Sequence, residues 1–414
     1  MCTLAPLRAW LEAMPKAELH LHLDGSLRPA TALELATTRD HGLGGVPVTE
    51  DAMRARLVAP VRCADQAELL HAFDLPIALL QDAEALERVT HELVEDVAGE
   101  GTTYAEIRWA PSLHTARGLS LADGVDAVVR GASAAAGEYG LIIRLIAVAL
   151  RTHAPETALE VTRTALRFRD QGLSGFDIAG VEQEVPDPLV FRESAELARA
   201  GGLGLSCHAG EWGGAAQVWR ALELDPWRIA HGAPAADDPE LMSELAERDV
   251  TLDICPTSNA QIGIGSAGED APLPRLLRAG VPVTISTDDR TVSDLTLALG
   301  GRSFKLRAGG FLEVPASTLM LFDPETLQLK QIKAYPLEQD LSRETLAKEL
   351  LQYPDQLALV ISQAKNLPGF SAPKTNPERW VYFCGKPGSD YFSWGPITGD
   401  FRIPFALIKE LSNG

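Results

Sequence analysis

The segment ELHLHLDGS spans residues 18–26 and places leucine at every second position from 19 to 23. Such alternation indicates a β-strand. Its two histidines, His20 and His22, are two residues apart, so on a strand both imidazoles lie on the same face. The polar and glycine residues at 24–26 end the strand. We therefore predict a strand over Glu18–Leu23 that carries two histidines toward its carboxyl end.

Seven further short apolar or β-branched runs follow, mostly separated by stretches rich in Ala, Leu, Glu and Arg. The eight runs are Glu18–Leu23, Tyr104–Ala110, Ile143–Leu150, Gly175–Val181, Gly204–Ala209, Arg228–Gly232, Thr251–Cys255 and Val281–Thr287. Alternating strands and helices, with nearly continuous apolar strands, indicate a parallel sheet. Eight such units predict an α/β fold, a (β/α)8 TIM-like barrel with its chemistry at the carboxyl ends of the strands. The stretch from Leu27 to Gly101 predicts a helical insertion after the first strand, including helices over Ala67–Leu80 and Ala83–Ala98.

Composition excludes several classes of protein. The chain has 414 residues, of which 46% are apolar, so a disordered or low-complexity chain is disfavoured. A net charge of -20 disfavours nucleic-acid binding, which needs clustered Lys and Arg. No apolar run is long enough to span a bilayer, and the N-terminus lacks the pattern of a secretory signal. Five cysteines with no close pair argue against a disulfide framework, and we expect a cytoplasmic enzyme.

Lysine usage and net charge change near residue 300. Residues 1–300 contain one lysine among 24 basic residues and 45 acidic residues, a net charge of -21. Residues 301–414 contain eight lysines, five arginines and 12 acidic residues, a net charge of +1. Two domains with different surface needs would explain this change, as would two segments of different origin joined near Leu297–Ser303. We predict a barrel over 1–300 and an unassigned α+β segment over 301–414.

Polar residues at the predicted strand ends form a candidate metal site. His208 ends the fifth strand and Asp288 follows the eighth, so on a barrel both meet His20 and His22 at one rim. Three imidazoles and one carboxylate suit Zn²⁺ and leave a position for water, although iron or cobalt would also fit. Two-metal hydrolases on this barrel often bridge their metals with a carboxylated lysine on the fourth strand. No lysine lies between Lys16 and Lys305, so we expect one metal.

Three more polar residues lie at the same rim. Glu211 is three residues past His208 and is our candidate proton shuttle, because a metal-activated water needs proton transfer. His231 ends the sixth strand; it either orients or deprotonates the water, or is a supporting hydrogen-bonded histidine. Asp289 adjoins a predicted ligand and either faces the substrate or is an exposed carboxylate. The remaining histidines are expected to be structural or exposed.

Together these motifs resemble the adenosine deaminase family over about residues 10–300. The matching motifs, in the family's order and spacing, are ELHLHLDGS at 18–26, DIAGVE at 177–182, HAGE at 208–211, RIAHG at 228–232, CPTSN at 255–259 and STDD at 286–289. The resemblance implies one zinc held by His20, His22, His208 and Asp288. It also implies conversion of adenosine to inosine with release of ammonia.

The resemblance assigns a role to each remaining site residue. Glu211 would protonate N1 of the purine, and His231 with Asp288 would orient the zinc hydroxide that attacks C6. Asp289 would hydrogen-bond N7, which needs a protonated donor in that pair. The backbone of Gly180 would approach N3, and Asp24 would contact a ribose hydroxyl. The sequence DGS at 24–26 resembles the adenosine form of the family more than the adenine or aminodeoxyfutalosine forms, so adenosine and deoxyadenosine are favoured.

The pattern departs from the family after residue 300. Residues 303–335 read as β-structure, with runs at Ser303–Leu306, Ser317–Phe322 and Leu327–Tyr335. We predict helices over Ser342–Leu351 and from Pro354 to about Leu367, and a strand at Trp380–Cys384. The family's closing helices, which would cover strands eight and one, are missing. The helix after Pro354 is one candidate to replace them, and the sequence leaves open whether the barrel closes without them.

Three functions remain open on sequence grounds. The first is a zinc-dependent adenosine deaminase, and the second is an adenine or aminodeoxyfutalosine deaminase. The third is a purine-binding fusion protein that turns over poorly, with its function in residues 303–414. In each, the partner is a small purine molecule, with no nucleic acid and no membrane, and the oligomeric state is not predicted.

Overall fold

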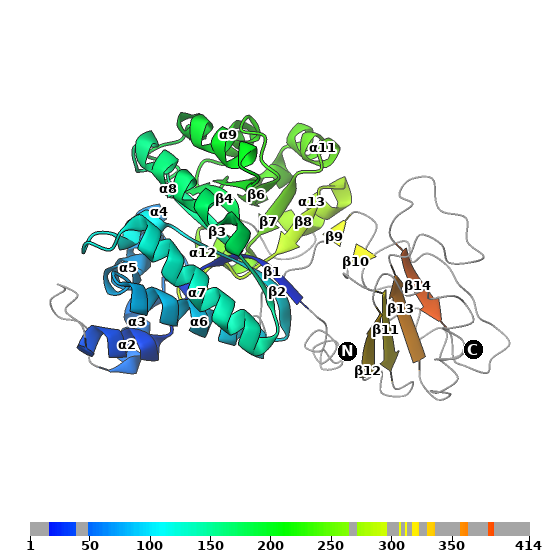
Figure 1. Ribbon diagram of the computed structural model, residues 1–414. Helices are drawn as coiled ribbons and strands as arrows, with labels where there is room; N and C mark the ends of the chain where they lie inside the picture. The colour runs from blue at the N-terminus through cyan, green and yellow to red at the C-terminus, as the bar shows by residue number, and fades with distance from the viewer. Residues whose placement is uncertain are drawn as a thin grey trace. The chain divides into compact units, whose positions relative to one another are not determined.

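A computed structural model describes residues 16–38, 49–264 and 271–295, together with the backbone of six strands between residues 306 and 384. The chain divides into two compact units (Figure 1). One consists of Pro15–Phe304, and the other combines Met1–Met14 with Lys305–Gly414. All the predicted site residues lie in the unit formed by Pro15–Phe304.

Eight parallel strands form the barrel, as the sequence predicts. They are β1 (Lys16–His22), β2 (Thr102–Trp109), β3 (Ile142–Leu150), β4 (Leu173–Ala179), β5 (Gly204–Ala209), β6 (Arg228–His231), β7 (Thr251–Ile254) and β8 (Val283–Ile285). Each strand pairs with the next in parallel register. The backbone of Asp288 closes the ring against β1: His22 N–H donates to Asp288 O at 2.9 Å, and Asp288 N–H donates to His20 O at 3.0 Å.

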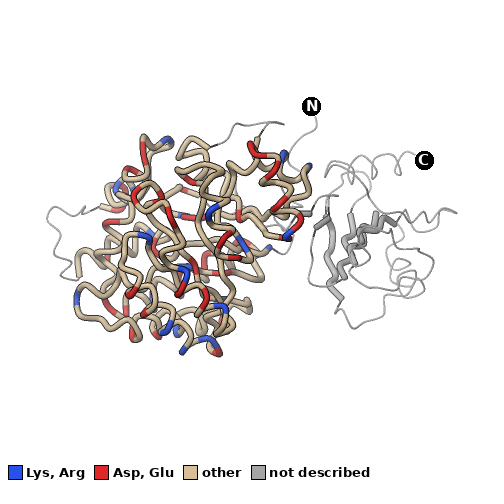
Figure 2. The backbone as a smooth tube through the Cα atoms, turned by 90° about the horizontal axis from the view of Figure 1, so that it is seen from above, with Lys and Arg blue, Asp and Glu red and all other residues tan. Residues whose placement is uncertain are grey.

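Helices connect the strands and cover the outside of the barrel (Figure 1). They are α2 (Pro29–Thr38), α3 (Glu50–Leu57), α4 (Gln66–Leu70), α5 (Asp74–Leu79), α6 (Ala83–Gly99), α7 (Leu121–Tyr139), α8 (Pro155–Arg167), α9 (Arg192–Ala200), α10 (Ala215–Leu222), α11 (Pro239–Glu247), α12 (Pro256–Gln261) and α13 (Pro272–Ala279). Asp82, Ser120 and Asp238 cap three of these helices by accepting backbone N–H groups of the first turn. Figure 2 shows Asp and Glu positions around the barrel with Lys and Arg interspersed among them.

The helical insertion after β1 is confirmed, but the single helix predicted over Ala67–Leu80 is wrong. The structure has two short helices there, α4 and α5, joined by a 3-10 turn at His71–Phe73. Pro76 explains the break, because it has no N–H to donate to the preceding turn. It is tolerated where it lies, in the first turn of α5.

The described part of the second unit is antiparallel β-structure. Short strands β9 (Leu306–Arg307) and β10 (Phe311–Leu312) pair, and a four-stranded sheet has the order β12-β11-β13-β14. Its strands are β11 (Ser317–Phe322), β12 (Leu329–Tyr335), β13 (Leu357–Ser362) and β14 (Trp380–Cys384). The strands predicted at Ser317–Phe322 and Trp380–Cys384 are confirmed.

The helix predicted from Pro354 to about Leu367 is wrong, because β13 occupies its centre. Leu357–Ser362 pairs with β11 on one side and β14 on the other. The run LALVIS is apolar and partly β-branched, and pairing on both edges favours a strand over an isolated helix. The proposal that a helix after Pro354 replaces the family's closing helices therefore fails. The helix predicted over Ser342–Leu351 lies outside the described residues. Within the described residues, no helix is long and apolar enough to cross a membrane.

Candidate active site

The predicted site residues meet at the carboxyl ends of the barrel strands. His20 and His22 lie on β1, His208 lies on β5, and His231 is the last residue of β6. Asp288 follows β8. Five of the six pairs among these four imidazole rings have centroids 4.9 to 5.3 Å apart. Residues far apart in sequence thus form one cluster at the centre of the rim.

Four ligand atoms are spaced as a zinc site requires. The Nε2 atoms of His20 and His22 are 3.1 Å apart, and those of His22 and His208 are 3.3 Å apart. Asp288 Oδ1 lies 2.9 Å from His20 Nε2 and 3.4 Å from His22 Nε2. Tetrahedral Zn²⁺ with bonds of about 2.0–2.1 Å holds its ligands about 3.3 Å apart. Three overlapping groups have ligand atoms close enough together to hold a metal ion: His20 with His22 and His208, His20 with His231 and Asp288, and His22 with Asp288 and Asp289.

The charge states of these groups favour a cation between them. Burial lowers the pKa of His22 to about 3 and holds the pKa of His20 well below its usual range. Both imidazoles are thus neutral, the form in which histidine binds a metal ion. Burial opposes ionisation of Asp288, but the adjacent His20 and His231 outweigh it and hold its pKa well below its usual range.

Two site residues adopt backbone conformations that side chains rarely accept. His231 has φ 65° and Asp288 has φ 67°, both in the left-handed region. Each such residue costs about 1–3 kcal/mol and persists only where its surroundings hold it. For Asp288 the two backbone hydrogen bonds to β1 supply that support. The fold therefore fixes these two side chains in unusual directions at the site.

A buried ion pair contacts the candidate metal ligands from inside the barrel. His208 Nδ1 lies 2.8 Å from Asp177 Oδ2, which leaves Nε2 to face the other ligands. Arg108, fully buried on β2, donates to Asp177 Oδ2 at 2.9 Å and to Leu19 O at 3.0 Å. Burial opposes ionisation of Asp177, but His208 and Arg108 outweigh it and depress its pKa. Sequence reasoning gave neither residue a role, although Asp177 lies within a quoted motif.

Glu211 lies above the cluster as a protonated carboxyl group. Burial raises its pKa to about 8, and the nearby Asp288 and Glu182 carboxylates add to this while His208 opposes it. Its Oε1 lies 3.4 Å from His231 Nε2, which is also 3.7 Å from Asp288 Oδ2. Burial lowers the pKa of His231, so this imidazole is neutral. Asn259 Nδ2 lies 3.4 Å from His231 Nδ1 on its other side.

Two further carboxyl groups line the pocket, and each has one buried oxygen without a hydrogen-bond partner among the described residues. Asp24 Oδ1 and Asp289 Oδ1 are buried and have no hydrogen-bond partner among the described residues. Burial raises the pKa of Asp24 to about 6, and burial together with Asp288 raises that of Asp289 well above its usual range. Gly25 makes room for Asp289, because a Cβ at residue 25 would lie 1.9 Å from Asp289 Oδ1. Both groups are placed to bond a ligand.

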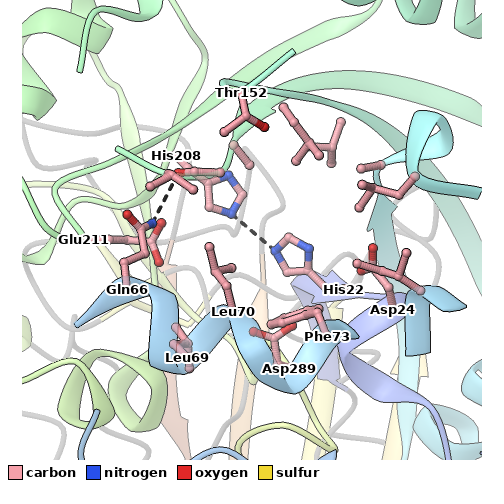
Figure 3. A pocket seen from close by; sticks show the side chains of 18 of the residues that line it. His22, Asp24, Gln66, Leu69, Leu70, Phe73, Thr152, His208, Glu211 and Asp289 are labelled. Atoms are coloured by element: carbon pink, nitrogen blue, oxygen red, sulfur yellow. Dashed lines mark hydrogen bonds between the residues drawn. The ribbon is translucent and has the colours of Figure 1, made fainter. Parts of the chain in front are cut away.

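The residues surround a cavity of about 250 Å³ (Figure 3). Figure 3 shows His22 and His208 pointing toward one another, with Glu211 and Gln66 on one side and Asp24 beyond His22. Leu69, Leu70 and Phe73 form an apolar wall from the helical insertion. Gly180 also lines the cavity, and His20 lies buried beneath it. No Lys or Arg occurs among the described residues that line it.

Comparison with known proteins agrees with this geometry. The family model described as adenosine deaminase matches residues 15–311. The chain belongs to the adenosine deaminase family. It is 38% identical over 284 residues to an adenosine deaminase of Enterococcus faecalis, covering 69% of this chain and 83% of the relative. It is also 36% identical over 309 residues to an aminodeoxyfutalosine deaminase of Acidothermus cellulolyticus, covering 72% and 83%.

A solved structure with bound Zn resembles this chain in its fold. An amidohydrolase of Burkholderia ambifaria, with bound Zn, aligns with a TM-score of 0.64 and 27% identity, covering 72% of this chain and 81% of that one. The protein is therefore a hydrolytic deaminase of the amidohydrolase TIM-barrel type. The relatives differ in their substrates, so membership of the family alone leaves the substrate open.

Proposed function

We propose that this deaminase converts adenosine and deoxyadenosine to inosine and deoxyinosine, with release of ammonia. One observation carries the proposal: the candidate zinc ligands and Glu211, whose pKa is raised, meet at one cavity. A hydrolytic deamination at C6 needs an activated water on the carbon and a proton donor for the ring nitrogen. The candidate metal ligands would supply the first when an ion is bound, and Glu211 would supply the second.

One Zn²⁺ per chain would be held by His20, His22, His208 and Asp288. This assignment rests on the spacing and neutrality of the donor atoms. When bound, the ion supplies a Lewis acid that brings the pKa of water near neutrality. Glu182, a carboxylate just after β4, has both oxygens bonded to backbone N–H groups instead of facing a second metal, which supports a single-metal site.

The chain's own residues would move the protons. Glu211 donates its proton to purine N1, which makes C6 electrophilic, and its raised pKa keeps it protonated at neutral pH. Neutral His231 lies beside both Glu211 and Asp288, so it orients the attacking water and accepts its proton. When the bond between C6 and the amino nitrogen breaks, His231 would return its proton to the leaving amino group, which departs as ammonia. The hydroxyl proton left on C6 would pass to Glu211, so that the carbonyl of inosine forms and both side chains recover their starting states.

Three further residues would recognise the substrate. Burial and the neighbouring Asp288 raise the pKa of Asp289 well above its usual range, which favours the protonated form that would donate a hydrogen bond to N7. Gly180, at φ 104°, lets the backbone approach N3. Asp24 accepts a hydrogen bond from a ribose hydroxyl, which satisfies its unpaired buried oxygen.

The lack of basic side chains around the cavity favours adenosine over nucleosides with an anionic 5′ substituent. Five acidic residues line it, namely Asp24, Asp74, Glu211, Asp288 and Asp289, and no Lys or Arg does so among the described residues. A phosphate or carboxylate on the 5′ carbon would lack a cationic partner there. Free adenine would leave the ribose partner, Asp24, unsatisfied. Both substrate alternatives are therefore disfavoured.

The ultraviolet difference spectrum of adenosine with zinc-loaded full-length protein tests the proposal. Conversion to inosine, lost with a chelator and restored by zinc, is the expected result. Adenine, AMP and aminodeoxyfutalosine serve as matched substrates. Faster turnover of one of these overturns the adenosine assignment. No turnover of any purine, with zinc bound, favours the purine-binding fusion protein instead.

A further inference from the structure

The loop that carries Glu211 is fastened to one buried carboxylate. Glu182 follows β4 and is 2% exposed. Its Oε1 accepts the N–H of Gly210 at 2.7 Å, and its Oε2 accepts the N–H of Trp212 at 2.8 Å and of Gly213 at 2.7 Å. Two of these three amides flank Glu211 directly. Three charge-assisted hydrogen bonds thus fix the backbone on both sides of the proposed acid.

The carboxyl group of Glu211 depends on this backbone for its position. Its neighbour His231 Nε2 is 3.4 Å away, which is too far for a strong hydrogen bond. Gly210 adopts φ 84°, and a Cβ there would lie 3.0 Å from Val218 Cγ2, so the loop also approaches α10 closely. Backbone placement rather than a side-chain bond therefore directs Glu211 toward the cavity.

Glu182 is itself connected to the helical insertion through Gln66. The Gln66 side chain, 4% exposed, accepts the N–H of Glu182 at 3.1 Å through Oε1. Its Nε2 donates to Gly180 O at 3.3 Å. Gln66 begins α4, the helix that also supplies Leu69 and Leu70 to the cavity wall. One side chain therefore links the wall, the backbone at Gly180 and the carboxylate that holds the acid's loop.

We propose that Glu182 is a positioning residue for Glu211, and that Gln66 joins this support to the cavity wall. The role needs a carboxylate, because only an acceptor at both oxygens can bond all three amides. A glutamine in place of Glu182 has one oxygen and one NH2 group. The NH2 group would face at least one of these backbone N–H groups, and two donors cannot form a hydrogen bond. The inference rests on the proposed function, in which Glu211 donates a proton to purine N1.

Glu182→Gln tests the proposal, with Glu184→Gln as a matched control. Glu184 is exposed and lies two residues further along the same loop, so the control changes the same charge nearby. We expect Glu182→Gln to bind zinc fully and to lower kcat about 10–100-fold, with KM changed less than about threefold, because a misplaced acid affects the chemical step more than binding. Glu184→Gln should match the wild type in zinc content, kcat and KM.

A ligand pair that differs only at N1 reports on the acid directly. Purine riboside and 1-deazapurine riboside are titrated against the wild type, Glu182→Gln, Glu211→Ala and the double variant. The wild type should prefer the ligand with N1, and Glu182→Gln should lose most of that preference. The double variant should match Glu211→Ala, because a residue that acts through Glu211 has no effect once Glu211 is gone.

Several outcomes overturn the inference. An intact N1 preference in Glu182→Gln, or a further loss of it in the double variant, means that Glu182 acts independently of Glu211. If Glu182→Gln does not fold, Gln66→Met must give the same selective loss of kcat and N1 preference. Wild-type turnover of adenosine, measured first, tests the proposed function alone. An active wild type with no effect at Glu182 or Gln66 refutes only the positioning role.

Discussion

Glu211 combines burial with a position that allows proton donation. It is not among the four proposed ligands, so its loss should leave the metal in place. We expect Glu211→Gln to retain one zinc per chain and to lower kcat about 10²–10⁴-fold, because the amide has no acidic proton to give. Zinc content by elemental analysis and turnover of adenosine check this together. Activity equal to that of the Glu184→Gln control would exclude Glu211 as the acid.

The raised pKa of Glu211 sets the direction of the pH dependence. A donor with pKa about 8 is protonated below that value and loses its proton as the pH rises through it. kcat/KM for adenosine should therefore fall above about pH 8, approaching tenfold for each further pH unit. A profile from pH 6 to 10, on enzyme checked for zinc content at each pH, measures it. A flat alkaline side would contradict the assignment.

The site residues predicted from the sequence lie together in the structure, but the sequence did not reveal all of the residues that contact and support them. His20, His208 and Asp288 are polar residues at strand ends, which is a visible signal. Arg108 lies within the run YAEIRW, where an arginine is as compatible with an exposed face as with the barrel interior. Its buried contact with Asp177 appears only when β2 and β4 are placed on one barrel. Asn259 belongs to the CPTSN motif, but nothing in the sequence alone indicates that it contacts His231.

At the level of elements, β1 is joined to the segment after β8 by Glu18 as well as by backbone bonds. Glu18 Oε1 accepts the N–H of Thr287 at 2.8 Å and its hydroxyl at 3.1 Å. Burial raises the pKa of Glu18 from 4.5 to about 7. Stability contributed by the neutral carboxyl is thus fully present below about pH 4.5 and is lost as the pH rises through 7.

Glu18→Gln should remove this pH dependence, because the amide keeps an acceptor for Thr287 and does not ionise. The variant's free energy of unfolding relative to wild type should rise between pH 4.5 and 7, by at most about 3 kcal/mol. Urea unfolding of chelator-treated protein at pH 5 and pH 8 measures the difference. Glu193→Gln, at an exposed position of α9, is the control. A difference that does not grow with pH would show that Glu18 titrates normally.

Two helix predictions were wrong because both relied on local sequence pattern. The local patterns of residues 67–80 and 354–367 both fit a helix, and periodicity does not separate short buried strands from helices. In the first case Pro76 broke the helix, and in the second, pairing of β13 with β11 and β14 decided the outcome. Local pattern therefore failed where a single residue or a distant strand overrode it.

For the whole molecule, the barrel was predictable because each βα unit repeats the same signal. Eight apolar strands separated by helices admit few arrangements, and right-handed parallel connections leave the barrel as the natural closure. Residues after 300 carry no such repeat, since their strands pair antiparallel between segments far apart in sequence, such as β11 with β13. Their arrangement depends on long-range pairing that composition does not reveal.

The metal site links strands from opposite parts of the chain, so zinc should stabilise the whole barrel. His20 and His22 come from β1, His208 from β5, and Asp288 from the segment after β8. A ligand that binds only the folded state stabilises it by about 4 kcal/mol at 1,000 times its Kd. Chelation should therefore lower the Tm of the barrel by about 8–16 °C, at about 2–4 °C per kcal/mol.

Differential scanning calorimetry with a chelator, and then with zinc restored, measures this shift. His208→Ala provides the control, because without that imidazole the ligand set is incomplete and the zinc-dependent part of the shift should disappear. Its zinc-free Tm should stay close to that of zinc-free wild type, apart from the cost of the lost Asp177 contact. A chelated wild type that keeps its Tm would show that the strands hold the site without the metal. A full zinc shift in His208→Ala would place the ion elsewhere.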